Sequence, residues 1–194
     1  MFVTESMIAD MAARYGQPER AGFRFELPAD QFGRIRSSQK HGRNHDVTVY
    51  IRKDDKIVVI AKHMYPPELY RAPSGGLRPG EPFLDGINRE IMEETGCTVE
   101  LERFFLRTAV SFVRREDGSS SGDGVIEWRS LVFLARYLSG DFQFTDHQEI
   151  REVRLATLDE FESFSRIMRA TDIGGLHYRA ALHDTVKRLL PTTE

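Results

Sequence analysis

The chain has 194 residues, of which 40% are hydrophobic and 29% charged, a balance typical of a single folded domain. Its 27 Lys and Arg residues against 30 Asp and Glu residues give a net charge of −3, so no basic excess indicates nucleic acid or an anionic membrane as the main partner. The longest apolar runs, Ile57–Ala61 and Leu131–Ala135, fall far short of the roughly 20 residues of a membrane span. The single cysteine, Cys97, excludes an internal disulfide bond and a multi-cysteine metal site.

The first residues contain no basic segment followed by an apolar stretch, so we expect no secretory signal and a cytoplasmic protein. Residues 1–45 are predicted to form an extension before the main domain. Apolar residues at helical spacing predict a helix over residues 4–15, and the alternation of Phe23, Phe25 and Leu27 with polar residues predicts a strand. This strand is too short to bury itself, so we expect the extension to contribute to a homodimer interface.

Residues 34–45 are basic and lack apolar periodicity, which predicts a solvated loop. The alternative is a basic arm that reaches a phosphate-bearing substrate. From residue 46 on, strands are predicted over residues 46–51, 57–61, 98–103, 105–114, 125–137 and 150–155, and helices over residues 83–95, 158–169 and 176–190. Because strands outnumber helices and short turns join neighbouring strands, the predicted fold is α+β, with a mixed, partly antiparallel sheet and helices packed against it.

The segment from residue 75 to residue 97 is the most informative part of the chain. Leu84, Ile87 and Ile91 fall on one stripe of the predicted helix. Three glutamates at i, i+3 and i+4 (Glu90, Glu93 and Glu94) form a cluster on a neighbouring face, outside the apolar stripe. Their charges repel one another, and clustered carboxylates are ligands that suit Mg²⁺. By themselves, three glutamates also suit a solvated acidic face.

A glycine-rich loop precedes this helix. Gly75, Gly76 and Gly80 permit the close backbone approach that a diphosphate requires. Taken together, loop and helix resemble the Nudix box, Gly-x5-Glu-x7-Arg-Glu-U-x-Glu-Glu-x-Gly-U, in which U is a bulky apolar residue. The matching positions are Gly75, Glu81, Arg89, Glu90, Ile91, Glu93, Glu94 and Gly96, with Cys97 at the last apolar position.

The resemblance implies a Nudix hydrolase domain over residues 46–194, with an α/β/α sandwich around the mixed sheet. It implies hydrolysis of a nucleoside diphosphate linked to another moiety, with Mg²⁺ or Mn²⁺ as cofactor. By motif position, the implied metal ligands are Glu90, Glu93, Glu94 and the backbone carbonyl of Ser74. Glu93 and Glu94 are also the implied catalytic residues; Arg89 is implied to orient the glutamates, and Glu81 to assist a metal-bound water or hold the loop.

Residues outside the box complete the implied site. Glu149 is the best match for a remote glutamate that binds metal or acts as a base, and Glu152 is the second choice. Tyr70 and Arg71 lie just before the box, and with Gly75 and Gly76 they are the expected substrate contacts. The polar segment 115–124 is predicted to be a mobile hairpin loop that influences the choice of substrate.

The sequence leaves the substrate open. No downstream subfamily signature is evident. A sugar nucleotide such as ADP-ribose is the first expectation, because sugar nucleotides are the commonest substrate class for family members of this size with an N-terminal extension, and a nucleoside triphosphate is the second. The alternative to an enzyme is a non-catalytic Nudix domain that senses a nucleotide or binds a protein. The diphosphate isomerases of this fold would need a reactive cysteine, and the place of Cys97 in an apolar position argues against that branch.

Overall fold

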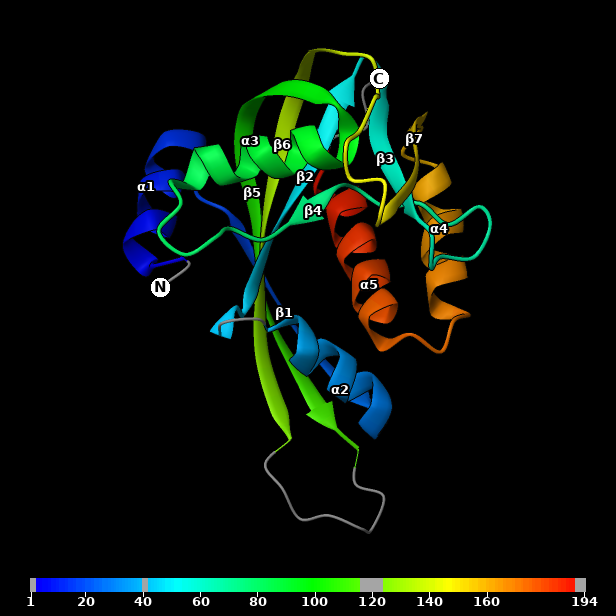
Figure 1. Cartoon of the computed structure of the whole chain (residues 1–194). Helices are drawn as coiled ribbons and strands as arrows, with labels where there is room; N and C mark the ends of the chain where they lie inside the picture. The colour runs from blue at the N-terminus through cyan, green and yellow to red at the C-terminus, as the bar shows by residue number, and fades with distance from the viewer. Residues whose placement is uncertain (1–2, 40–41, 116–123, 191–194) are drawn as a thin grey trace.

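One mixed β-sheet with helices on both faces forms the centre of the molecule (Figure 1). The computed structural model describes residues 3–39, 42–115 and 124–190. The helices in these residues are α1 (Glu5–Tyr15), α2 (Ala29–Ser38), α3 (Phe83–Thr95), α4 (Glu160–Arg169) and α5 (Gly174–Leu189). The strands are β1 (Glu19–Leu27), β2 (His45–Lys53), β3 (Lys56–Lys62), β4 (Ser74–Gly75), β5 (Cys97–Arg114), β6 (Val125–Gly140) and β7 (Ile150–Ala156).

The strand order of the sheet is β1-β5-β6-β2-β3-β7, and the short β4 pairs with β2 beside this path. β1 runs parallel to β5, and β2 runs parallel to β6. The pairs β5–β6, β2–β3 and β3–β7 are antiparallel. The prediction of a mixed, partly antiparallel sheet is therefore confirmed. β5 and β6 are long, and they extend past β2, β3 and β7 toward the bottom of Figure 1, where β1 pairs with β5 up to its last residue, Arg114.

The first apolar core lies between the sheet and helices α1 and α3. Ile8 from α1 and Ile87 and Ile91 from α3 are buried against Val49 and Phe133 of the sheet. The stripe predicted for the acidic helix is thus its buried side. Side chains of β2 contribute to the cores on both faces of the sheet, because successive side chains of a strand point to opposite faces.

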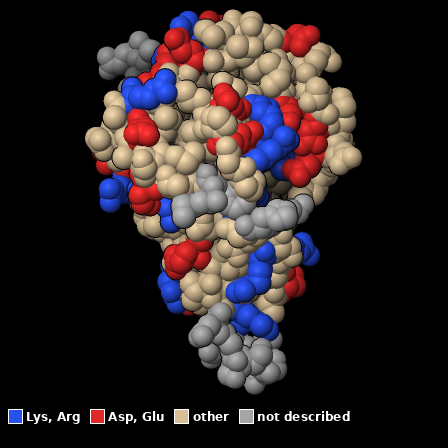
Figure 2. Space-filling view, turned by 60° about the vertical axis from the view of Figure 1, so that its left-hand side comes forward, with Lys and Arg blue, Asp and Glu red and all other residues tan. Residues whose placement is uncertain are grey.

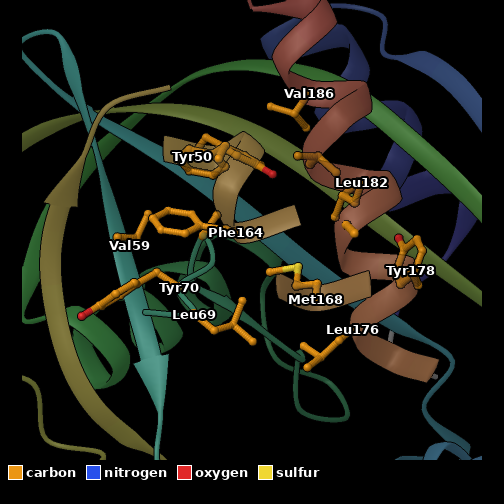
Figure 3. Packing of buried hydrophobic residues seen from close by; sticks show 14 of the residues in the cluster. Tyr50, Val59, Leu69, Tyr70, Phe164, Met168, Leu176, Tyr178, Leu182 and Val186 are labelled. Carbon is orange, nitrogen blue, oxygen red and sulfur yellow. The ribbon is translucent and has the colours of Figure 1, made fainter. Parts of the chain in front are cut away.

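The second apolar core lies on the opposite face, under helices α2, α4 and α5. Figure 3 shows Tyr50, on β2, beside Phe164 of α4 and Leu182 of α5. Phe32 of α2 is buried in the same cluster. Helices on both faces of a mixed sheet form the α/β/α sandwich that the resemblance implied.

The predicted loop over residues 34–45 is wrong for residues 34–38, which belong to α2. Contacts with α5 explain the difference, because they come from a distant part of the chain. The Gln31 side chain accepts a hydrogen bond from the backbone N–H of Gly174 at 2.7 Å and donates one to the carbonyl of Asp172. Phe32 is buried beneath the helix. The two strands predicted over residues 98–114 are one strand, β5, whose pairing with β6 is irregular between Leu101 and Leu106.

The aromatic residues of the N-terminal strand are covered within the chain. Phe23 and Phe25 of β1 contact the ring of Tyr178 on α5, with centroid distances of 5.9 and 6.2 Å, and Phe25 stacks on Phe112 of β5. The predicted loop over residues 115–124 falls mostly on residues 116–123, which lie outside the described residues. Within the described part of the chain, no helix is long and apolar enough to cross a membrane.

Candidate active site

A cavity of about 440 Å³ lies where β4, helix α3, helix α5 and the segment before β7 meet. Nine charged residues line it: Arg43, Asp46, Lys62, Arg71, Glu90, Glu94, Asp146, Glu149 and Arg179. Charges of both signs are also interspersed over the molecular face in Figure 2. The cavity therefore brings together residues from the glycine loop, the acidic helix, the predicted remote glutamate and two segments that the motif does not cover.

Glu94 is the innermost carboxylate of the site. Its side chain accepts a hydrogen bond from the backbone N–H of Ser74 at 2.8 Å and lies 3.4 Å from the guanidinium of Arg71. Glu94 and Arg71 are both buried, with 4% and 3% of their surface exposed. Burial raises the pKa of Glu94. The expectation that Glu94 lies outside the buried side of the helix is therefore wrong, because Arg71 and Ser74 supply polar contacts for its carboxylate in the interior.

The first glycine of the box, Gly75, leaves the space that the carboxylate of Glu90 occupies. A Cβ atom at Gly75 would overlap that carboxylate, and the nearest aliphatic carbon of Glu90 would lie 2.5 Å from it. Because only glycine leaves this space free, the loop and the acidic helix approach closely at this point. Glu90 thus lies against the loop backbone and faces the cavity.

Arg89 joins the outer carboxylates of the site. Its guanidinium donates two hydrogen bonds to Glu81, at 2.7 and 2.9 Å, one to Glu90 at 2.8 Å and one to Glu93 at 3.1 Å. A longer bond of 3.3 Å reaches the carbonyl of Gly76. The hydrogen bonds from Arg89 lower the pKa of Glu81 to about 2, and those same bonds raise the pKa of Arg89. The geometry supports the orienting role that the resemblance implied for Arg89.

The loop before β7 is tied to the acidic helix and carries Glu149 into the cavity. The backbone carbonyl of Glu93 accepts hydrogen bonds from the N–H groups of Thr145 and Asp146, both at 3.0 Å. The side chain of Glu149 forms a close ion pair with Lys62 of β3. Glu149 and Glu90 therefore reach the same cavity from different segments of the chain.

Tyr70 and Glu152 are not brought to this cavity. The Tyr70 hydroxyl donates a hydrogen bond to Glu152 at 2.7 Å, and its ring packs against Phe164 with a centroid distance of 5.5 Å. Arg154 covers the ring at 4.0 Å. Figure 3 shows Tyr70 in the second apolar core with its hydroxyl directed outward. The geometry thus favours Glu149 over Glu152 as the remote acidic residue of the cavity, and it gives no support to a substrate contact by Tyr70.

The carboxylates are held by cationic side chains in this arrangement. Among the described residues, no group of three His, Cys, Asp or Glu side chains is assembled closely enough to hold a metal ion. Arg89 pairs with Glu90 and Glu93, while Lys62 pairs with Glu149. The donor set still fits a hard divalent cation, because it consists of carboxylate oxygens beside a loop backbone that a side chain at Gly75 would block.

Several charged or aromatic residues of the cavity, including Arg179, Asp46, Arg43 and Trp128, were not predicted as site residues from the sequence. Arg179 of α5 donates hydrogen bonds to Asp46 at 2.6 Å and to the hydroxyl of Ser74 at 3.0 Å. Arg43 and Trp128 also line the cavity. Arg179 and Asp46 are too far apart in the sequence for local spacing to reveal their pairing. Arg43, by contrast, belongs to the basic segment for which a substrate-reaching arm was the alternative interpretation.

Cys97 is buried at the end of the acidic helix, with 2% of its surface exposed. Burial also raises the pKa of its thiol, so the reactive thiolate is disfavoured. An isomerase that depends on a reactive cysteine is therefore not supported by this site.

Comparisons with known proteins agree with the fold. The model of the NUDIX domain family matches residues 42–173. A NUDIX hydrolase from Nitrosomonas europaea is similar in structure, with a TM-score of 0.50 and 19% identity over 76% of this chain and 92% of that chain. A UDP-X diphosphatase has a TM-score of 0.47 and 21% identity over 78% and 71% of the two chains. An ADP-ribose pyrophosphatase from Streptococcus suis has a TM-score of 0.44 and 18% identity over 78% and 96%. No curated protein matches the chain.

Proposed function

Because the chain belongs to the NUDIX domain family, we propose that it is a divalent-metal-dependent hydrolase of nucleoside diphosphates linked to another moiety. The observation that carries this proposal is the shared cavity. Glu90 and Glu94 of the box line it together with Glu149, beside the two glycines of the loop. A diphosphate in this cavity would meet carboxylates, backbone and guanidinium groups together.

We assign the metal to Mg²⁺ or Mn²⁺, held by Glu90, Glu93, Glu94 and Glu149 with the carbonyl of Ser74. Such a cation neutralises phosphate charge and lowers the pKa of a bound water. Glu94 would provide the fixed ligand, because Arg71 and the Ser74 N–H hold it in place. Glu93 and Glu149 are more exposed, and they are the groups that rearrangement can bring to the cation.

The chain's own residues supply positioning and proton transfer. Arg89 fixes the directions of Glu90 and Glu93, and the Glu93 carbonyl ties the loop of Glu149 to the acidic helix. Glu149 is our candidate to accept a proton from the attacking water, because it lines the cavity from a loop outside the box. Phosphoryl transfer depends mainly on positioning and electrostatics, and such an arrangement can provide both.

We keep a sugar nucleotide such as ADP-ribose as the first candidate substrate and a nucleoside triphosphate as the second. We test the function with a panel of both classes, measuring released phosphate or nucleotide with Mg²⁺, with Mn²⁺ and with EDTA. Glu94→Gln keeps the shape of the side chain and is expected to lower kcat by about a hundredfold or more. The matched control is Glu100→Gln on exposed β5 surface, which should leave turnover unchanged.

Thermal unfolding of each variant shows whether it is folded. A folded Glu94→Gln protein with wild-type turnover would contradict the site assignment. Saturable nucleotide binding without hydrolysis of any panel member would favour the sensor alternative.

Homodimerisation through residues 1–45 and a cytoplasmic location stay predictions. β1 is the last strand on one side of the sheet order, and an edge strand of this kind can pair with a second copy. Light scattering at micromolar concentration tests the dimer, because a mass equal to the 22.3 kDa of one chain would refute it.

A further inference from the structure

Arg43 is a cation of the cavity wall whose charge the described residues do not neutralise. It lies in the short segment between α2 and β2 and lines the cavity. Within the part of the chain that the structure describes, its guanidinium forms no ion pair, and its buried Nε atom has no hydrogen-bond acceptor. An unpaired charge and a donor without an acceptor are both unfavourable in a partly buried position.

The other cations of the cavity are already paired. Arg71 lies 3.4 Å from Glu94, Arg179 lies 2.6 Å from Asp46, and Lys62 is in close contact with Glu149. Their charges are therefore largely offset by neighbouring carboxylates. Arg43 differs from them because none of its N–H donors has an acceptor among the described residues.

The surroundings of Arg43 hold it next to the glycine loop. A Cβ atom at Gly76 would lie 2.9 Å from the guanidinium carbon of Arg43, closer than real contacts allow. On another side, the guanidinium carbon lies 5.7 Å from the ring centroid of Trp128. The second glycine of the loop thus leaves room for a guanidinium, as the first leaves room for the carboxylate of Glu90.

We propose that Arg43 is a substrate-binding residue that contacts a phosphate of the nucleoside diphosphate. The assumption that the bound anion is a nucleoside diphosphate rests on the proposed function. The observation that the Arg43 guanidinium is unpaired does not depend on it. A guanidinium matches phosphate oxygens with paired, charge-assisted hydrogen bonds. The position of Arg43 against Gly76 places this group at the glycine loop, in the cavity that Glu90 and Glu94 also line.

The experiment measures binding without hydrolysis. The probe is the α,β-methylene analogue of ADP, whose bridging carbon resists cleavage, with Mg²⁺ present. Trp128 is the only tryptophan of the chain, so its fluorescence reports on this cavity. Titration calorimetry measures the same affinities independently.

We expect Arg43→Gln to weaken binding of the analogue by about tenfold or more, because it removes charge-assisted hydrogen bonds to phosphate. The affinity of Arg43→Lys should lie between those of wild type and Arg43→Gln, since a lysine keeps the charge but lacks the planar pair of donors. Gly76→Ala should also weaken binding, because the added methyl displaces the guanidinium. The matched control is Arg34→Gln, a residue of the same basic segment whose side chain is 68% exposed. Its affinity should stay within about twofold of wild type.

Adenosine separates phosphate recognition from base recognition, because it has no phosphate. Its affinity should be the same for wild type and Arg43→Gln. The proposal is overturned if Arg43→Gln binds the analogue as wild type does, if it loses adenosine and analogue equally, or if wild type does not bind the analogue. Hydrolysis measured in parallel judges the function separately. Turnover with an unchanged KM in Arg43→Gln would refute only the role of Arg43, whereas Arg43-dependent binding without any turnover would refute only the hydrolase.

Discussion

Replacement of Arg89 by lysine keeps the positive charge of the site but removes the planar group that joins three carboxylates. Arg89 donates five hydrogen bonds, four of them to Glu81, Glu90 and Glu93. A lysine has three donors on one nitrogen and cannot span these acceptors. At least two bonds to charged groups are lost, and at roughly 1.5 kcal/mol each the free energy of unfolding should fall by about 3 kcal/mol.

Urea unfolding in the presence of EDTA measures this loss without a contribution from bound metal. The matched control is Arg78→Lys, whose side chain is 65% exposed and lies 3.6 Å from Glu93. An exposed pair of this kind contributes little, so the control should change stability by less than about 0.5 kcal/mol. The reasoning is refuted if Arg89→Lys is as stable as wild type. It is also refuted if the two variants lose the same amount, because the bridging geometry would then not matter.

Three further changes test other parts of the structure. Glu149→Gln should lower kcat by about tenfold or more with little change in KM, and Glu152→Gln should leave kcat unchanged; the reverse result would transfer the role to Glu152. Gly75→Ala should abolish turnover while the protein remains folded, because the added methyl displaces Glu90, and wild-type kcat in this variant would refute the need for close approach. Burial lowers the pKa of His183 to about 3, so the unfolded chain takes up a proton that the native state excludes, and stability falls as the pH falls below about 6.5. From about pH 7 to about pH 5 the wild type should lose about 2 kcal/mol through this group. His45, whose pKa burial lowers to about 4, weakens both proteins over the same range, so urea unfolding should show a loss smaller by about 2 kcal/mol for His183→Phe; an equal loss in both would contradict the burial argument.

Local spacing was sufficient to predict the acidic helix and its buried side. Ile87 and Ile91 are one turn apart, and Gly96 ends the helix with a φ of 67°, a conformation that favours glycine. At Gly96 a side chain would also overlap the backbone of Gln143. These signals lie within the segment itself, so the sequence contains them.

Contacts between distant parts of the chain could not be predicted in this way. Helix α2 has one fully buried residue, Phe32, and its polar contacts are with residues near Gly174. Glu94 looks like a surface residue by its charge, and the positions of Arg71 and Ser74 explain how that charge is accommodated in the interior. The residue type and spacing of the box indicate its chemistry, but the surrounding fold decides which carboxylate is buried.

The pairing of β1 with β5 sets a limit on how the protein can be shortened. Nine residues of β1 are in register with Leu106–Arg114 of β5, and Tyr178 of α5 lies under the aromatic residues of β1. A fragment cut at the ends of the family match, residues 42–173, would lack both β1 and α5. It would expose the backbone edge of β5 and a large part of the second apolar core, the conditions under which sheets associate edge to edge. The unit that an expression experiment must keep intact is therefore longer at both ends than the unit that defines the family.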